Sequence, residues 1–255
     1  MTNVFRKGWR PAAVLLLLFI LWELAVNFAE VPAWLLPPPT DIIQEAVMGW
    51  EGFRMHLQST VLLSLWGFAI GTAIGLLTAV ILHLLPFIRE SIYPLLILSQ
   101  NVPIIVLAPL LVVWFGFGVL PKLIVITLVC FFPITVAALD GFRQTPGELR
   151  HYMLMAGAGR GQLFWKLELP YSLPSLFSGL KISATYSVMG AVISEWLGAK
   201  AGIGVYMTLA SSSFRTDRVF VAIFAIMLLS LLFFGGILLA ERLLIKWKSR
   251  ESGRK

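Results

Sequence analysis

The sequence has little charge. Only 13% of its 255 residues are Asp, Glu, Lys or Arg, against roughly a quarter in ordinary soluble domains. Hydrophobic residues make up 58%, and the mean hydropathy is +0.87. Several apolar runs reach the length of about 20 residues that a helix needs to cross a bilayer. The composition therefore excludes a soluble globular domain and predicts an all-α, polytopic membrane protein.

Cysteine and the usual signs of catalysis are also scarce. Cys130 is the only cysteine, so an intrachain disulfide is excluded, and its apolar surroundings indicate a packing role. The histidines His56, His83 and His151 lack the spacing of metal ligands. No nucleophile motif or paired carboxylate site is present. We expect no catalytic residue, no metal and no cofactor on this chain.

Strand patterns and internal repeats are absent as well. Many secondary transporters are built from inverted repeats, and the apolar runs contain few charges that could couple transport to ions. These absences argue against a self-contained secondary transporter or channel, and against a membrane-embedded enzyme, without removing either alternative. We expect residues 1–255 to form a single transmembrane domain.

Six apolar runs are long enough to be spans. The first follows a basic stretch as a signal peptide would, but its length and the lack of a small-x-small cleavage site favour a retained helix. The third contains Pro94, Pro103 and Pro109, so we expect it to be kinked beside a cavity or buried in protein. The predicted spans are 12–29, 60–83, 92–115, 119–139, 175–197 and 219–240.

The distribution of basic residues predicts the orientation. With both termini cytoplasmic, 15 of the 20 Lys and Arg residues lie inside, as the positive-inside rule requires. The same clustering at termini and short loops accounts for the net charge of +7 without nucleic acid. The five basic residues left outside are Arg54, Lys122, Lys200, Arg215 and Arg218.

Two segments are then external. Residues 30–59 contain LPPPT, an expected extended turn, and DIIQEAVMGW, an expected amphipathic helix along the membrane surface. The loop 199–218 is rich in Gly and Ser and too short to be a domain.

The longest cytoplasmic interruption is residues 140–174. Thr145, Pro146 and Glu148 form a capping-box pattern that predicts a helix starting at Pro146 and ending near Gly157 and Gly159. A second short helix is expected from Arg160, with Leu163, Phe164 and Leu167 on one face and Gln162, Lys166 and Glu168 on others. Two short helices joined by glycines suit docking into a groove of a partner. An ordinary solvated loop is the alternative. The glycines follow no strand and lack a Gly-Lys-Ser/Thr ending, which argues against nucleotide binding.

The end of this loop resembles the EAA motif of permease subunits of bacterial ABC importers. Gly157 is followed by nine residues, Leu167, one residue, Leu169 and Pro170, as in that motif. Where the family has Glu-Ala-Ala, this chain has His151, Tyr152 and Met153, so we expect changed contacts at the first turn. The runs NVPIIVLAPLLVVWFGFG and SGLKISATYSVMGAVISEWLGAKAGIG are similar to the nitrate, sulfonate and taurine branch. The stretches SQNVPI, CFFPI and ATYSVMGAVISEWLGA resemble most closely permeases assigned to thiamine-precursor pyrimidine uptake.

The resemblance implies a type I importer located in the inner or plasma membrane. Its partners would be an ABC ATPase subunit that binds ATP and Mg, an extracytoplasmic substrate-binding protein, a second permease copy in a homodimer, and the lipid bilayer. Sulfonate, taurine, nitrate and riboflavin-type substrates stay open. The loop would form coupling helices that contact the ATPase. The residues implied in coupling are Glu148, His151, Met155, Ala156, Gly157, Ala158, Arg160, Leu167, Leu169 and Pro170.

Polar groups inside the spans are candidates for the substrate pathway, because facing lipid would cost several kcal/mol. For each of them a helix-to-helix hydrogen bond is the alternative. Glu23, in the first span, is expected to join helices. Gly71 and Gly75 have GxxxG spacing, which predicts close helix packing. The candidate pathway residues are Gln100, Asn101, Tyr186, Ser194, Glu195 and Trp196.

Overall fold

The computed structural model describes residues 2–245 of the chain, with side chains from Trp9 onward. These residues form helices and no strands. Among the basic residues counted for the orientation, Lys246, Lys248, Arg250, Arg254 and Lys255 lie outside the described residues, and the side chains of Arg6 and Lys7 are not described.

Five helices are long and apolar enough to cross a membrane, and a sixth candidate span is a bent pair. Each of the six predicted spans therefore corresponds to a helix or to this pair. The five are α1 (Thr2–Phe28), α3 (Trp50–Leu84), α6 (Val119–Arg143), α9 (Leu169–Glu195) and α11 (Thr216–Leu244).

The third predicted span, 92–115, is not one helix. It is divided into α4 (Pro86–Ser99) and α5 (Ile104–Phe115), which meet at an angle of 99°. Pro103 precedes α5 in an extended conformation, and proline has no N–H with which to continue the ladder of α4. The predicted kink is thus confirmed. Burial, the other alternative, differs between the two halves: α4 has no buried residue, whereas Ala108 and Leu111 of α5 are buried against Val125 of α6.

The core lies where α3, α6 and α9 pack together. Ile126, Cys130 and Ile134 of α6 are fully buried at its centre. A side chain on Gly71 of α3 would lie 2.7 Å from Cβ of Cys130, so the glycines allow α3 and α6 to approach closely. This confirms the packing interpretation of both Gly71 and Cys130.

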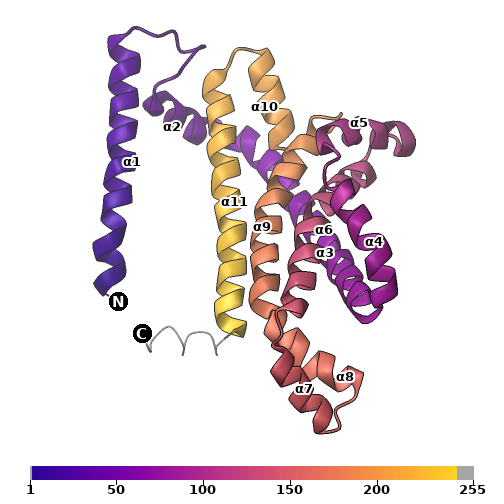
Figure 1. The fold of residues 1–255 in the computed structure, drawn as a ribbon. Helices are drawn as coiled ribbons and strands as arrows, with labels where there is room; N and C mark the ends of the chain where they lie inside the picture. Colours follow the sequence, from indigo (N-terminus) through magenta and orange to yellow (C-terminus); the bar gives the residue numbers. More distant parts are fainter. Residues whose placement is uncertain (1, 246–255) are drawn as a thin grey trace.

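Short helices close the two ends of the bundle (Figure 1). The α10 end has α2 (Pro39–Met48) and α10 (Ile203–Ser212), together with the amino end of α3. The loop end has α7 (Gly147–Met155) and α8 (Arg160–Leu163), which project below the bundle. The amino end of α1 and the carboxyl end of α11 also lie toward the loop end (Figure 1).

Two segments of the α10 end contain helix that the sequence did not predict. Residues 50–59, expected in an external segment, are the first turns of α3. The loop 199–218 contains the helix α10, which the Gly and Ser content concealed. The two helices contact each other: Nδ1 of His56 lies 2.9 Å from the carbonyl oxygen and 3.1 Å from the backbone nitrogen of Gly202, the residue before α10, and Ile203 is fully buried.

Candidate functional site

The helix α7 ends where Gly157 was expected to end it. The N–H of Gly157 donates to the carbonyl of Leu154, and the N–H of Ala158 donates to the carbonyl of Met153, both at 3.0 Å. This pair of bonds is the Schellman arrangement, which places the residue after the cap in the left-handed region. Gly157 has a φ of +83°, where any other residue would be strained. The glycine therefore sets the direction in which the chain leaves α7.

The start of α7 differs from the prediction. The helix begins at Gly147, Pro146 is its N-cap, and no side chain caps it. Because Pro146 is extended, Thr145 lies one residue too early to reach the first free N–H groups, and its hydroxyl has no partner. The capping box predicted from Thr145 and Glu148 is wrong. A related bond forms at α8 instead, where the N–H of Gly159 donates to Oε1 of Gln162 at 3.2 Å.

The second loop helix begins at Arg160 as predicted but does not end. It continues through a π-helical segment, η1 (Phe164–Glu168), directly into α9. Pro170 lies in the first turn of α9, where a missing N–H is tolerated, and Pro174 lies inside the helix. The helix α8, the segment η1 and the fifth span thus form one continuous helical stretch, Arg160–Glu195, whereas α7 is separated from it by a turn.

Large apolar side chains are exposed on the loop. Met155 is 77% exposed, Tyr152 72% and Trp165 67%. We call the set that shares this exposure the loop surface: Leu149, Tyr152, Leu154, Met155 and Trp165. Exposed apolar groups on the part that projects from the bundle indicate a contact with another protein.

The predicted coupling residues lie on this loop, in two environments. The exposed ones lie on α7, in the turn after it and at the start of α8; of the half-buried ones, Ala158 lies in that turn and the others lie in η1 and the first turn of α9. Exposed are Glu148, His151, Met155, Ala156, Gly157 and Arg160; half-buried are Ala158, Leu167, Leu169 and Pro170.

Glu168 was expected on a different face of the loop helix from Leu163 and Phe164, but it is buried as they are. It is 4% exposed, and its Oε2 lies 2.7 Å from Nε2 of His83 in α3. The cause is η1, where the N–H of Leu169 bonds to the carbonyl of Phe164, five residues back. A π turn holds about one residue more than an α turn, so Glu168 rotates onto the buried face of Leu163. An α-helical period cannot predict this position.

Among the candidate pathway residues, Glu195 and Ser194 are fully buried at the end of α9. Thr60 of α3 donates its hydroxyl to Oε1 of Glu195 at 2.7 Å, and the N–H of Gly204 donates to Oε2 at 2.8 Å. Ser194 donates to the carbonyl of Ala191. Glu195 therefore joins three helices, which is the helix-to-helix alternative considered for it.

The other pathway candidates are exposed to different degrees. Gln100 and Asn101 lie at the break between α4 and α5, and Asn101 donates to the carbonyl of Ile97 at 3.1 Å. Tyr186 is 42% and Trp196 43% exposed. No hydrogen bond of the described residues joins the side chains at the α4–α5 break to Tyr186, Glu195 or Trp196, so this chain alone does not assemble the six into one site.

Glu23 joins helices as expected. Its carboxylate accepts from the hydroxyl of Thr40 at 2.8 Å and from the N–H of the same residue at 3.1 Å. Thr40 belongs to the first turn of α2, whose N–H groups have no partner within the helix. The carboxylate therefore fastens α2 to α1.

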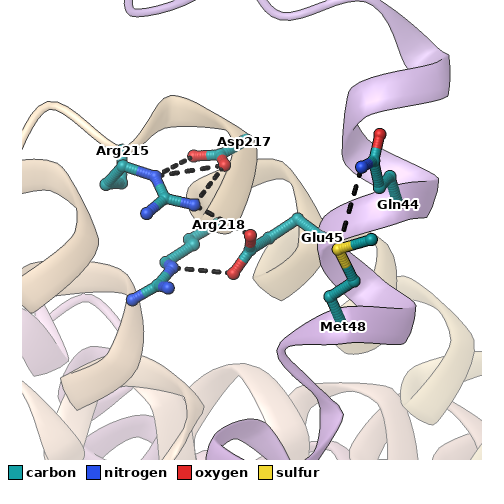
Figure 2. Close-up of polar contacts among 6 residues, drawn as sticks. All are labelled: Gln44, Glu45, Met48, Arg215, Asp217 and Arg218. Carbon is teal, nitrogen blue, oxygen red and sulfur yellow. Dashed lines mark hydrogen bonds and ion pairs between the residues drawn. The ribbon is translucent and has the colours of Figure 1, made fainter.

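An ion cluster at the α10 end was not predicted. Glu45 of α2 accepts one bond from Arg215 and one from Arg218, both at 2.8 Å, and Asp217 also pairs with Arg215 at 2.7 Å. Figure 2 shows these four residues facing one another between α2 and the start of α11. The hydrogen bonds to Asp217 raise the pKa of Arg215 above its usual value. We call these four residues the α10-end cluster. It joins α2 to the start of α11, and the bond between Glu45 and Arg215 connects positions 170 residues apart in sequence.

The three histidines lie in different parts of the molecule: His56 at the α10 end, His83 at the loop end and His151 on exposed α7. No group of three or more His, Cys, Asp or Glu within residues 2–245 is arranged to hold a metal ion.

Comparison with known proteins identifies the family. Residues 71–246 match the family described as "Binding-protein-dependent transport system inner membrane component". The chain is 34% identical to the formylaminopyrimidine transport permease protein of Halalkalibacterium halodurans, over 96% of this chain and 98% of the relative. It is 31% identical to the riboflavin transport system permease protein of Chloroflexus aurantiacus, over 92% and 88% of the two chains. It is 26% identical to the taurine transport system permease protein of Escherichia coli, over 91% and 87%.

These matches, together with the apolar helices, establish a multi-pass membrane protein of a family in which a coupling helix and an EAA motif are typical. The chain belongs to the inner-membrane components of binding-protein-dependent transport systems, the permease subunits of ABC importers, which are non-catalytic and leave ATP hydrolysis to a separate subunit.

Proposed function

We propose that the chain forms the membrane pathway through which an importer takes up a thiamine-precursor pyrimidine delivered by an extracytoplasmic binding protein. The observation that supports this substrate most strongly is the 34% identity to a formylaminopyrimidine permease over nearly the full length of both chains. Riboflavin is the second candidate, favoured by the relative at 31% identity.

The loop surface is the proposed contact with the ATPase subunit. Its exposed aromatic and aliphatic groups, above all Trp165 and Met155, are of the kind that fill pockets at protein interfaces. The two states of the ATPase must contact the loop differently, because a ligand with equal affinity for two conformations shifts neither. ATP binding and hydrolysis on that partner would then move α7 and η1, and the spans would alternate between outward-facing and inward-facing arrangements.

Both termini and the loop are proposed to be cytoplasmic. The excess of basic residues on one side supports this orientation. The amino end of α1, the carboxyl end of α11 and the loop also lie at one end of the bundle in Figure 1. The α10 end would then face the binding protein.

A second copy of the chain is proposed to cover the break between α4 and α5. Irregular backbone at membrane depth is tolerated only where protein or a water-filled cavity covers it, yet Gln100 and Asn101 are exposed in the single chain. A homodimer with this break at its centre would supply such cover. In that arrangement Gln100 and Asn101 of both copies would line the pathway.

The homodimer is tested with a cysteine at Val102, in a variant whose native Cys130 is replaced by Ala. Val102 is 47% exposed beside the break. We expect oxidation to cross-link two copies in membranes. A cysteine at Leu62, 58% exposed on α3, is the control that should stay monomeric. Cross-linking at Leu62 and none at Val102 would contradict the proposed interface.

The substrate is tested on the binding protein that delivers it. A ligand at a hundred times its Kd stabilises a folded protein by about 2.7 kcal/mol, which a thermal-shift assay detects. We expect a formylaminopyrimidine to raise the melting temperature, and taurine, an aliphatic sulfonate, nitrate and riboflavin to leave it unchanged. Uptake of the labelled pyrimidine by the reconstituted importer is the second measurement. A shift with riboflavin alone would replace the proposed substrate with the second candidate.

A further inference from the structure

We propose that His83 is a positioning residue that transmits movement of the coupling loop to α3 through its bond to Glu168. The inference rests on the proposed role of the loop. It explains how α3, a span that is not continuous with the loop, would follow the movement of the loop.

The loop is joined by the chain itself to α6 on one side and α9 on the other. α3 has no such connection and meets the loop region only through side chains. Its polar contact is the pair His83–Glu168, at 2.7 Å, with the two side chains 13% and 5% exposed. A buried bond of this kind holds its partners at a fixed separation, since neither group can turn to water instead.

Neighbouring side chains also hold the His83–Glu168 pair in place. The ring of His83 packs against that of Phe142 in α6, with centroids 4.6 Å apart, and against Phe164 of η1 at 5.9 Å. The second carboxylate oxygen of Glu168 lies 3.7 Å from Nε of Arg150 in α7. One carboxylate therefore contacts α7 and α3 from its place in η1. Single π turns inside helices occur often at functional sites, and here the extra residue is what turns Glu168 inward.

α3 is suited to carry such a movement across the membrane. It runs for 35 residues, and no proline interrupts it, whereas α6 and α9 contain Pro133 and Pro174. At its far end, Thr60 donates to Glu195 and accepts from the N–H of Ile203 at 2.8 Å. A displacement at His83 would thus reach the contacts between α9 and α10 at the other face of the bundle.

The experiment measures substrate transported per ATP hydrolysed, in the complete importer reconstituted in liposomes. The main variant is the double change His83→Leu with Glu168→Met. Replacing both partners of a buried polar pair by apolar groups of similar size is often close to neutral for stability, whereas removing one leaves the other unpaired. We expect the double variant to retain the ATPase subunit and its melting temperature, and to lose about fivefold or more in transport per ATP, the lower end of ordinary coupling between sites.

Lys181 and Glu241 provide a matched control. They form a partly buried pair of 2.9 Å between α9 and α11, with side chains 19% and 13% exposed, and do not touch the loop. The double change Lys181→Met with Glu241→Met should leave transport per ATP as in the native protein. An equal loss in both double variants would overturn the proposal, because any buried pair would then suffice.

Two single variants decide the question if the His83–Glu168 double variant does not assemble. Glutamine places an amide N–H near the position of Nε2, so His83→Gln should keep the bond to Glu168 and most of the transport per ATP. His83→Asn is too short to keep it and should lose transport per ATP. Equal ratios in the two would overturn the proposal.

The outcomes separate this inference from the proposed function. If the native chain fails to retain the ATPase subunit, the proposed function of the loop fails. If the native chain retains it and the double variant transports normally per ATP, the role of His83 in transmission is wrong and the loop proposal stands. If the double variant alone loses the ATPase, the comparison of His83→Gln with His83→Asn decides, and equal ratios in those two overturn the role of His83.

Discussion

The two ends of the bundle differ in whether their side chains find partners within the chain. At the α10 end, Glu45 binds two arginines, Glu195 joins three helices and His56 holds the start of α10. At the loop end, α7 has no buried residue, and the large side chains of Met155, Tyr152 and Trp165 are exposed. One end is held together by bonds within the chain, and the other exposes large apolar side chains.

This difference separates two kinds of requirement on the sequence. If the binding protein docks at the α10 end as proposed, stable geometry there would let it meet the same surface at each cycle. If the ATPase docks at the loop end as proposed, the loop surface would have to follow the state of that partner. Changes at the loop end should therefore alter assembly and coupling, while changes at the α10 end should alter stability.

The largest effect is expected at the loop surface. Changing Met155 and Trp165 together to Glu places charge where the ATPase would bury apolar groups. Interface positions of this kind cost about 2 kcal/mol or more when altered, which is about thirtyfold in affinity. We expect co-purification of the ATPase subunit to fall accordingly. Met48→Glu, at a residue 73% exposed at the opposite end, is the control that should retain it.

A smaller effect is expected at the turn between the loop helices. Gly157→Val forces a side chain into a φ of +83°, at a cost of about 1–2 kcal/mol for a residue in the left-handed region. The chain should then leave α7 in another direction, and transport should fall while the bundle stays folded. Gly161→Val is the matched control, since Gly161 lies in α8 without a positive φ and has free space around it. Normal transport by the Gly157 variant would contradict the role of the turn in coupling.

The smallest effect is expected at the α10-end cluster. Glu45→Gln leaves Arg215 paired with Asp217 and weakens the attachment of α2. Partly exposed ion pairs contribute about 0.2–1 kcal/mol, so the melting temperature should fall slightly and less so in high salt. Glu51→Gln removes the exposed pair with Arg54 at 3.6 Å and should change nothing measurable. Loss of the ATPase in the Glu45 variant would show that the two ends are not independent.

The parts of the fold that follow from composition and period could be predicted from the sequence. Apolar length located the spans, and the Gly71–Gly75 spacing predicted the close contact with α6. Gly157 was predicted as the end of α7 because few other residues tolerate that conformation. The capping pattern at Thr145 gave a wrong prediction, because Pro146 is extended and the helix begins one residue later.

The polar pairs between distant segments could not be predicted. His83 and Glu168 are 85 residues apart, and the inward turn of Glu168 depends on a π-helical segment that no periodic pattern announces. The α10-end cluster joins α2 to α11 in the same way. In the sequence, Glu168 is only a carboxylate on a short loop helix, and His83 is only a lone histidine at the end of a span. Each residue by itself indicates a side chain that is exposed to solvent or hydrogen-bonded to a neighbour.

Site-directed cross-linking between the loop and the ATPase subunit tests the central claim most directly. Single cysteines are placed at Met155 and at Met48, at opposite ends and 77% and 73% exposed, with the buried Cys130 replaced by Ala. A bifunctional thiol reagent is then added to the assembled importer carrying a cysteine on the face of the ATPase toward the membrane. We expect a cross-linked product from position 155, changed by ATP, and none from position 48. A product from position 48 and none from position 155 would contradict it.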